Sequence, residues 1–176
     1  MLSFTSNAAA MPTALDANPD RLDQHEQNFV RKIREHGWFG THVMPDKVGP
    51  GFAYTTGFWL KFAFPEVILF SLLKASAHDT FWTIYRELEA GGRLPIGEPT
   101  GEVFENVTAV LLPVSREQYS SHLGWSRWFY GNDEFECVQL VYPDRRGEFP
   151  WTPGSSEGFR ASQPDLTAGG WSGLRG

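Results

Sequence analysis

Residues 123–151, LGWSRWFYGNDEFECVQLVYPDRRGEFPW, hold the densest group of aromatic side chains in the chain. The rings within residues 125–130 recur at helical spacing, and a glycine-containing acidic turn, 131–133, follows them. Strand-forming residues 137–142 come next and end at a second turn, 143–147. Large rings beside tight turns are typical of a chain that lines a cleft or builds a contact surface, and the sequence leaves both alternatives open.

Upstream of this stretch, the pattern of apolar residues predicts a sheet. Residues 38–44 and 52–58 are short strand-like runs separated by a loop with proline and glycine. Residues 67–73, VILFSLL, are apolar on both faces, which predicts a central strand covered on each side. A further strand is expected within VTAVLLPV, 107–114. Because tight turns separate the first strands, we predict a mostly antiparallel sheet, with a curled, barrel-like sheet as the open alternative.

Apolar residues at helical spacing predict helices that pack on this sheet. One is expected from Asn18, a capping residue, to Gly37, and another from Ser76 to Gly91. Shorter helical turns are expected over 116–123 and around the aromatic residues that follow. The order of elements therefore predicts the α+β class: a mostly antiparallel, barrel-like or open sheet with two to four packed helices.

The length of the chain suits one domain with a tail at each end. Its 176 residues include 41% apolar and 15% aromatic residues, which is enough to form one core. Small and polar residues predict a disordered N-terminal segment over 1–17. Abundant Gly, Ser and Pro predict a flexible tail over 152–176. A single α+β domain is therefore expected over 18–151.

Charge and hydropathy exclude several classes of function. The 15 basic and 21 acidic residues give a formal charge of −6, and no basic run offers a surface for nucleic acid. No stretch of about 18 apolar residues predicts a membrane span. The N-terminus lacks the pattern of a secretion signal, so a cytoplasmic protein is expected. The acidic balance suits a soluble protein or one that meets a basic partner.

Cysteine and histidine spacing predicts neither a metal site nor a resident cofactor. The single cysteine, Cys137, cannot form an intrachain disulfide and is expected to be a buried, inert thiol. No HxH, HxxxH or HExxH arrangement occurs among the histidines, and phosphate-binding glycine loops are also missing. The histidines are His25, His36, His42, His78 and His122.

Four pieces of the sequence resemble a known family. They are HGW at 36–38, FAYTTGF at 52–58 with PE at 65–66, HLGWSRWFYG at 122–131, and QLVYPD at 139–144 with FPW at 149–151. Together they resemble the bacterial domain-of-unknown-function family numbered 4262, over roughly residues 22–151. The resemblance implies a single compact bacterial domain and supplies no activity, substrate or catalytic residue.

Polar and aromatic side chains near the ends of the predicted elements are the candidate site residues. Glu66 leads a fully apolar strand, so burial would require a partner for its carboxylate. Arg127 is the predicted partner, because a guanidinium between two tryptophans can stack and still bind a carboxylate. The candidate residues for binding a ligand or partner are His36, Tyr54, Thr55, Glu66, Trp125, Arg127, Trp128, Tyr130, Asp133, Gln139 and Asp144.

Two functions follow from these residues. The first is a non-catalytic protein that binds a basic protein partner through the aromatic residues 125–130 and the acidic turn 133–136, as immunity proteins and antitoxins do. The missing catalytic motifs favour it. The second is an enzyme or small-ligand binder with a pocket between helices and sheet, of which a split-barrel flavin binder is one variant. Its pocket would be lined by His36, Tyr54, Thr55, Glu66, Arg127, Tyr130 and Gln139.

Overall fold

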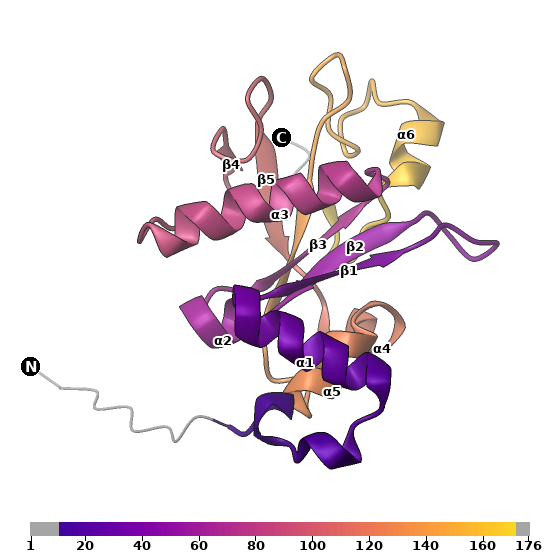
Figure 1. Cartoon of the computed structure of the whole chain (residues 1–176). Helices are drawn as coiled ribbons and strands as arrows, with labels where there is room; N and C mark the ends of the chain where they lie inside the picture. The colour runs from indigo at the N-terminus through magenta and orange to yellow at the C-terminus, as the bar shows by residue number, and fades with distance from the viewer. Residues whose placement is uncertain (1–10, 172–176) are drawn as a thin grey trace, which may run out of the picture.

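An open, mixed sheet of six strands carries the fold (Figure 1). The computed structural model describes residues 11–171. The strand order is β1-β2-β3-β6-β5-β4. The strands are β1 (Phe39–Val43), β2 (Phe52–Thr56), β3 (Glu66–Phe70), β4 (Pro99–Thr100), β5 (Ala109–Pro113) and β6 (Cys137–Val141).

The sheet consists of two antiparallel units joined by one parallel pair. Strands β1, β2 and β3 pair antiparallel in sequence order, and so do β4, β5 and β6. Strand β3 pairs parallel to β6, with Glu66 opposite Cys137 and Ile68 opposite Gln139. The α+β class is confirmed, but β1 and β4 remain as edges, so the barrel-like alternative is wrong. The flavin-binding split barrel loses its structural basis with it.

Helices α1 (Gln24–His36), α2 (Phe58–Phe62), α3 (Lys74–Glu89), α4 (Tyr119–His122), α5 (Gly124–Tyr130) and α6 (Glu157–Ser162) accompany the sheet, which is more than the two to four predicted. Three short 3-10 turns lie at Ala14–Asp16, Pro19–Arg21 and Arg116–Gln118. Within the described residues, no helix is long and apolar enough to cross a membrane.

The two long helices start at residues that the sequence pattern did not indicate. Asn18 caps only the short turn that follows it, whereas Asp23 caps α1 and exchanges hydrogen bonds with Glu26. Helix α3 begins at Lys74, two residues before Ser76. The polar residues near the helix starts thus predicted that these two helices exist, but they did not predict the residues at which the helices begin.

Helices cover both faces of the first antiparallel unit. Strand β3 is fully buried, and its side chains alternate between two apolar clusters. Val67 and Leu69 pack under α3, with Phe81 of that helix. Ile68 packs on the opposite face, with Phe29 of α1. Figure 1 shows α3 above the sheet and α1, α4 and α5 below it. The prediction of a central strand covered on each side is confirmed.

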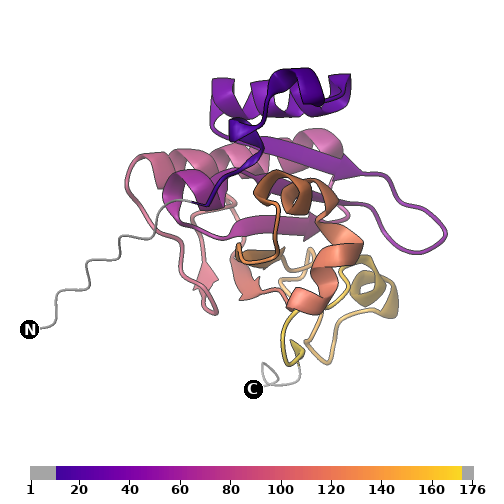
Figure 2. The ribbon, with the colours of Figure 1, turned by 90° about the horizontal axis from the view of Figure 1, so that it is seen from below.

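The described C-terminal segment, 152–171, packs on the second antiparallel unit. The side-chain amide of Gln139 on β6 donates a hydrogen bond of 2.7 Å to the Pro164 carbonyl and accepts one of 3.1 Å from the Leu166 N–H. Leu166 is buried, and Thr167 forms a bridge with Val114. Figures 1 and 2 place this yellow segment at the opposite end of the molecule from the indigo α1. The ordered structure thus continues past residue 151.

Only part of the expected disordered N-terminus falls within the described residues. Residues 1–10 lie outside them. Residues 11–17 contain the short turn Ala14–Asp16, which Thr13 caps. The guanidinium of Arg34, on α1, donates a hydrogen bond to the Leu15 carbonyl. This turn is therefore tied to the first helix.

We expect Cys137 to be unreactive in the folded protein. The thiol is buried on β6, and burial, with the nearby Glu66 carboxylate, raises the pKa of Cys137 well above its usual value. Since the thiolate is the reactive form, an aromatic disulfide reagent at about pH 8 should leave the native thiol unmodified and should react with it fully in urea. Rapid stoichiometric reaction of the native protein would contradict this expectation.

Candidate functional site

A fully buried carboxylate, Glu66, joins four elements of the fold. Its oxygens accept hydrogen bonds from the backbone N–H groups of residues 57–59, at 2.8, 3.3 and 3.1 Å. The Thr55 hydroxyl donates at 2.6 Å and the Tyr130 hydroxyl at 2.5 Å. One carboxylate from β3 therefore fixes the end of β2, the first turn of α2 and the last residue of α5.

The local sequence explains why Glu66 is needed there. Helix α2 starts after Gly57, whose φ of 120° is open to glycine, and this N-cap residue has no side chain that could cap the helix. The first N–H groups of a helix have no partners within it, and Glu66 supplies an acceptor for them. Burial raises the pKa of Glu66, while the hydrogen bonds from Thr55 and Tyr130 act in the opposite direction.

The Glu66 cluster is closed to solvent, so its chemistry is structural. Glu66 and Thr55 have no exposed surface, and Tyr130 has 6%. Burial and the Glu66 charge raise the pKa of Tyr130, which keeps its hydroxyl protonated as a donor. The structure thus brings Thr55, Glu66 and Tyr130 together in a hydrogen-bonded latch, whereas the sequence suggested that they line a ligand pocket.

The predicted Glu66–Arg127 pair is wrong. The Arg127 guanidinium binds the Asp133 carboxylate, with a distance of 2.7 Å between Nε and Oδ1. Both side chains are about two-fifths exposed, which makes this a surface ion pair. Backbone N–H groups of residues 57–59 donate hydrogen bonds to Glu66 instead. Because every residue except proline has such a group, the sequence does not show which of them will bind a buried carboxylate.

The aromatic residues of α5 pack inward. The Trp125 ring stacks on Phe29 of α1, with 4.8 Å between ring centroids and an interplanar angle of 14°. Trp128 meets the same Phe29 ring edge-on at 6.0 Å. The Tyr54 hydroxyl accepts a hydrogen bond from the Trp125 N–H at 3.0 Å, and burial raises the pKa of Tyr54. These residues therefore fasten α5 and α1 to the sheet.

The remaining candidate residues lie apart from this region and from each other. Gln139 binds the C-terminal segment. Asp144 accepts hydrogen bonds from the backbone N–H groups of Glu148 and Arg146, which lower the pKa of Asp144 and close the turn after β6. His36 is half exposed at the end of α1. The structure does not bring these three residues together with the Glu66 cluster.

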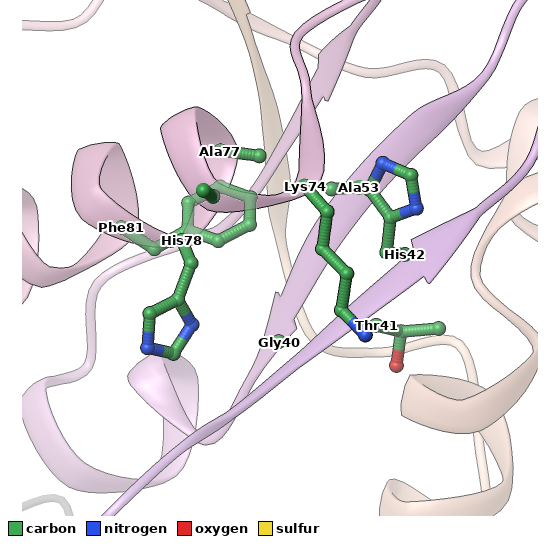
Figure 3. Close-up of a pocket in the computed structure, with 9 residues that line it drawn as sticks. Gly40, Thr41, His42, Ala53, Lys74, Ala77, His78 and Phe81 are labelled. Atoms are coloured by element: carbon green, nitrogen blue, oxygen red, sulfur yellow. The ribbon is translucent and has the colours of Figure 1, made fainter.

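A cavity that the sequence did not indicate lies between α3 and the edge strand β1. It has a volume of about 510 Å³ and a largely apolar lining. Ala53, Ala77 and Phe81 are buried at its wall, while His42, Lys74 and His78 bring polar groups to its rim. Figure 3 shows Lys74 extending from the start of α3 toward β1, with His42 beside Ala53. We refer to this cavity as the α3–β1 pocket. Its lining residues are Gly40, Thr41, His42, Ala53, Lys74, Ala75, Ala77, His78 and Phe81.

The ionisable groups around the α3–β1 pocket are all bases. No aspartate or glutamate lines it, although the chain carries 21 acidic residues. Lys74 forms no ion pair with any residue between 11 and 171. Lys74 is also the first residue of α3, where the helix dipole adds positive potential. This pocket is therefore positive on an acidic protein.

His78 has one ring nitrogen committed within the protein. The indole N–H of Trp82 donates a hydrogen bond of 2.9 Å to Nε2 of His78. A neutral imidazole that accepts at Nε2 carries its proton on Nδ1, so Nδ1–H remains as a donor. His42, Lys74 and His78 are the basic side chains of this lining that can donate hydrogen bonds to an acidic group.

The sequence did not predict that these basic residues line one pocket, because their proximity depends on strand register. His42 faces α3 only because it pairs with Ala53 across β1 and β2, and Ala53 points into the core under α3. The spacing of His42 and His78 in the sequence suggests no joint role. No group of three or more metal-ligating side chains was found when residues 11–171 were searched.

Comparison with known proteins gave one match. A family model described as a domain of unknown function, DUF4262, matches residues 32–156. The matched range includes the Glu66 cluster and the α3–β1 pocket. No curated protein and no solved structure matches the chain.

Proposed function

Because the chain belongs to the DUF4262 family, as its sequence motifs predicted, and that family is defined without an activity, we propose its function from the geometry. The protein binds a small molecule with an apolar body and an acidic group in the α3–β1 pocket. The observation that carries this proposal is an apolar cavity whose ionisable lining residues, His42, Lys74 and His78, are all bases.

Size and chemistry of the pocket support a small organic acid. A volume of about 510 Å³ lies within the range of roughly 300–1,000 Å³ that is common for ligand sites. The alanine and phenylalanine wall favours apolar atoms, since burial of such atoms is worth about 25 cal/mol per Å². The donors at the rim favour a carboxylate or phosphate, because charge-assisted hydrogen bonds are the stronger kind.

Binding of a basic protein partner has less support than the pocket. Its proposed anchors, Trp125 and Trp128, pack against Phe29, and Asp133 is paired with Arg127. Hot-spot aromatic residues must be free to enter a partner's surface, and these two rings are half-buried against the protein's own core. Only the exposed acidic side chains of the 133–136 turn remain available for such a partner.

The proposal predicts that Lys74→Gln weakens binding of an aromatic acid. Benzoate, titrated into the full chain and followed by ligand-observed NMR, is expected to show saturable binding. Loss of the Lys74 charge should raise its Kd by about 5-fold, which corresponds to about 1 kcal/mol for one solvent-exposed charge contact.

The matched control is Lys47→Gln, which removes a lysine from the loop between β1 and β2, outside the pocket lining. It should leave the Kd of benzoate unchanged. If benzoate does not bind saturably, or if the two variants bind it equally, the proposed function is refuted.

A further inference from the structure

We propose that the ligand site continues past Gly40 into a second, aromatic pocket, so that the ligand is an elongated acid with a planar ring at the end remote from its acidic group. This inference rests on the proposed function and specifies its ligand class. The second cavity, which we call the tryptophan pocket, has a volume of about 280 Å³. Its lining residues are Lys32, His36, Trp38, Phe39, Gly40, His78 and Trp82.

The two cavities adjoin because they share wall residues. Gly40 of β1 and His78 of α3 line both of them. The lining of the tryptophan pocket, like that of its neighbour, contains no carboxylate, and Lys32 has no ion-pair partner among the described residues. Lys32 and His36 come from α1, and His36 lies 3.7 Å from the Glu35 carboxylate, so Lys32 is the unpaired base of this second pocket within residues 11–171.

Gly40 lies at the boundary between the two pockets, with the Trp38 ring packed against it. A Cβ atom on this residue would lie 3.1 Å from Cζ3 of Trp38, which lines the tryptophan pocket. The same atom would lie 3.7 Å from Cδ2 of Phe81, which lines the α3–β1 pocket. A side chain at this position would therefore press on the Trp38 ring at the boundary between the two cavities.

Flat walls make the tryptophan pocket suitable for a ring. Trp38 and Trp82 meet at 86° with 5.3 Å between their centroids and form a corner. Trp82 is half-buried and gives this corner most of its open ring surface, whereas Trp38 is 3% exposed and closes the inner end. The His78 ring stacks on Trp38 at 5.4 Å and is held there by the hydrogen bond from Trp82. Aromatic side chains prefer stacked and edge-to-face contacts with planar groups, so this corner favours an aromatic ring over a branched aliphatic chain.

The test compares two acids that differ by one ring: benzoate and biphenyl-4-carboxylate. The wild-type protein is expected to bind the two-ring acid about 10- to 100-fold more tightly, because the second ring is buried in the tryptophan pocket. Gly40→Ala should reduce this preference to about 3-fold or less, because its methyl group displaces Trp38, which lines the tryptophan pocket. The comparison uses the ratio of the two Kd values, because Gly40 also lines the α3–β1 pocket and its replacement can change the Kd of benzoate itself.

Gly49→Ala is the matched control. Gly49 lies in the loop between β1 and β2, and a Cβ atom there would meet no atom within 4 Å. This variant should keep the wild-type preference for two rings. If Gly40→Ala does not fold, as judged by circular dichroism, Trp82→Leu replaces it, because loss of one flat wall should also abolish the preference.

The outcomes separate the two proposals. If benzoate binds with the expected dependence on Lys74 but the wild-type protein shows no preference for the second ring, only the inference of a second pocket is overturned. The same conclusion follows if Gly40→Ala or Trp82→Leu keeps the full preference. If neither acid binds, the proposed function itself fails.

Discussion

Glu66→Ala is expected to lower the free energy of unfolding by about 3–5 kcal/mol. The carboxylate accepts hydrogen bonds from the N–H groups of residues 57–59 and from the hydroxyls of Thr55 and Tyr130. Its removal leaves these donors without an acceptor in a region closed to solvent. Each buried donor left unsatisfied costs about 1–3 kcal/mol, and water that enters the new space recovers part of this.

Urea unfolding followed by tryptophan fluorescence measures this loss, with Glu134→Ala as the control. Glu134 is an exposed glutamate, so its replacement should change stability by less than about 0.5 kcal/mol. Glu66→Gln should be intermediate, because the amide keeps one acceptor oxygen but turns its own N–H₂ toward other donors. A Glu66→Ala variant as stable as the control would show that the buried network contributes nothing to stability.

Gly57→Ala is the second substitution with a large expected cost, about 3–5 kcal/mol. The φ of 120° at this residue is unfavourable for any side chain. The new Cβ would also lie 2.5 Å from the Gly37 carbonyl oxygen and 2.9 Å from Cα of Trp38. Both are backbone atoms, which cannot move aside as a flexible side chain can.

Gly131→Ala separates the two causes of this cost. Gly131 also has a positive φ, 70°, but a Cβ atom there would meet nothing within 4 Å. Its replacement should therefore cost only the backbone strain, about 1 kcal/mol. Equal midpoints for the two variants in thermal unfolding would mean that the close approach of residues 37 and 57 is unimportant.

The main helices and strands could be predicted from the sequence because the patterns that indicate them are local. The fully apolar run at 67–73 identified the central strand β3, and helical spacing identified α1 and α3. The parallel pairing of β3 with β6 could not be predicted in this way, since it joins residues about seventy positions apart. The packing of residues 163–167 on the sheet could not be predicted either, because it depends on long-range contacts such as the hydrogen bonds of Gln139 and the bridge between Val114 and Thr167.

The candidate site was harder to predict from the sequence than the fold, for a physical reason. The need of Glu66 for a partner followed from burial, but its donors are mostly backbone N–H groups. Aromatic density at 125–130 suggested a contact surface, although the same rings also suit a core, and the structure uses them there. One pocket is lined by His42, Lys74 and His78 only because of strand register and the position of α3, which are properties of the tertiary structure.

The parallel contact between β3 and β6 has a consequence for how the chain could be divided. Each antiparallel unit of the sheet is a continuous piece of sequence, and the connection after α3 passes through residues 90–98. A cut in this connection would yield two fragments. In each fragment one strand, β3 or β6, would have a free edge that can pair with the other fragment. Glu66 would lie in one fragment and Tyr130 in the other, so the hydrogen bond between them would form only when the fragments meet. The fold is thus arranged for fragment complementation, in which reassembly would restore the buried latch and both apolar clusters at once.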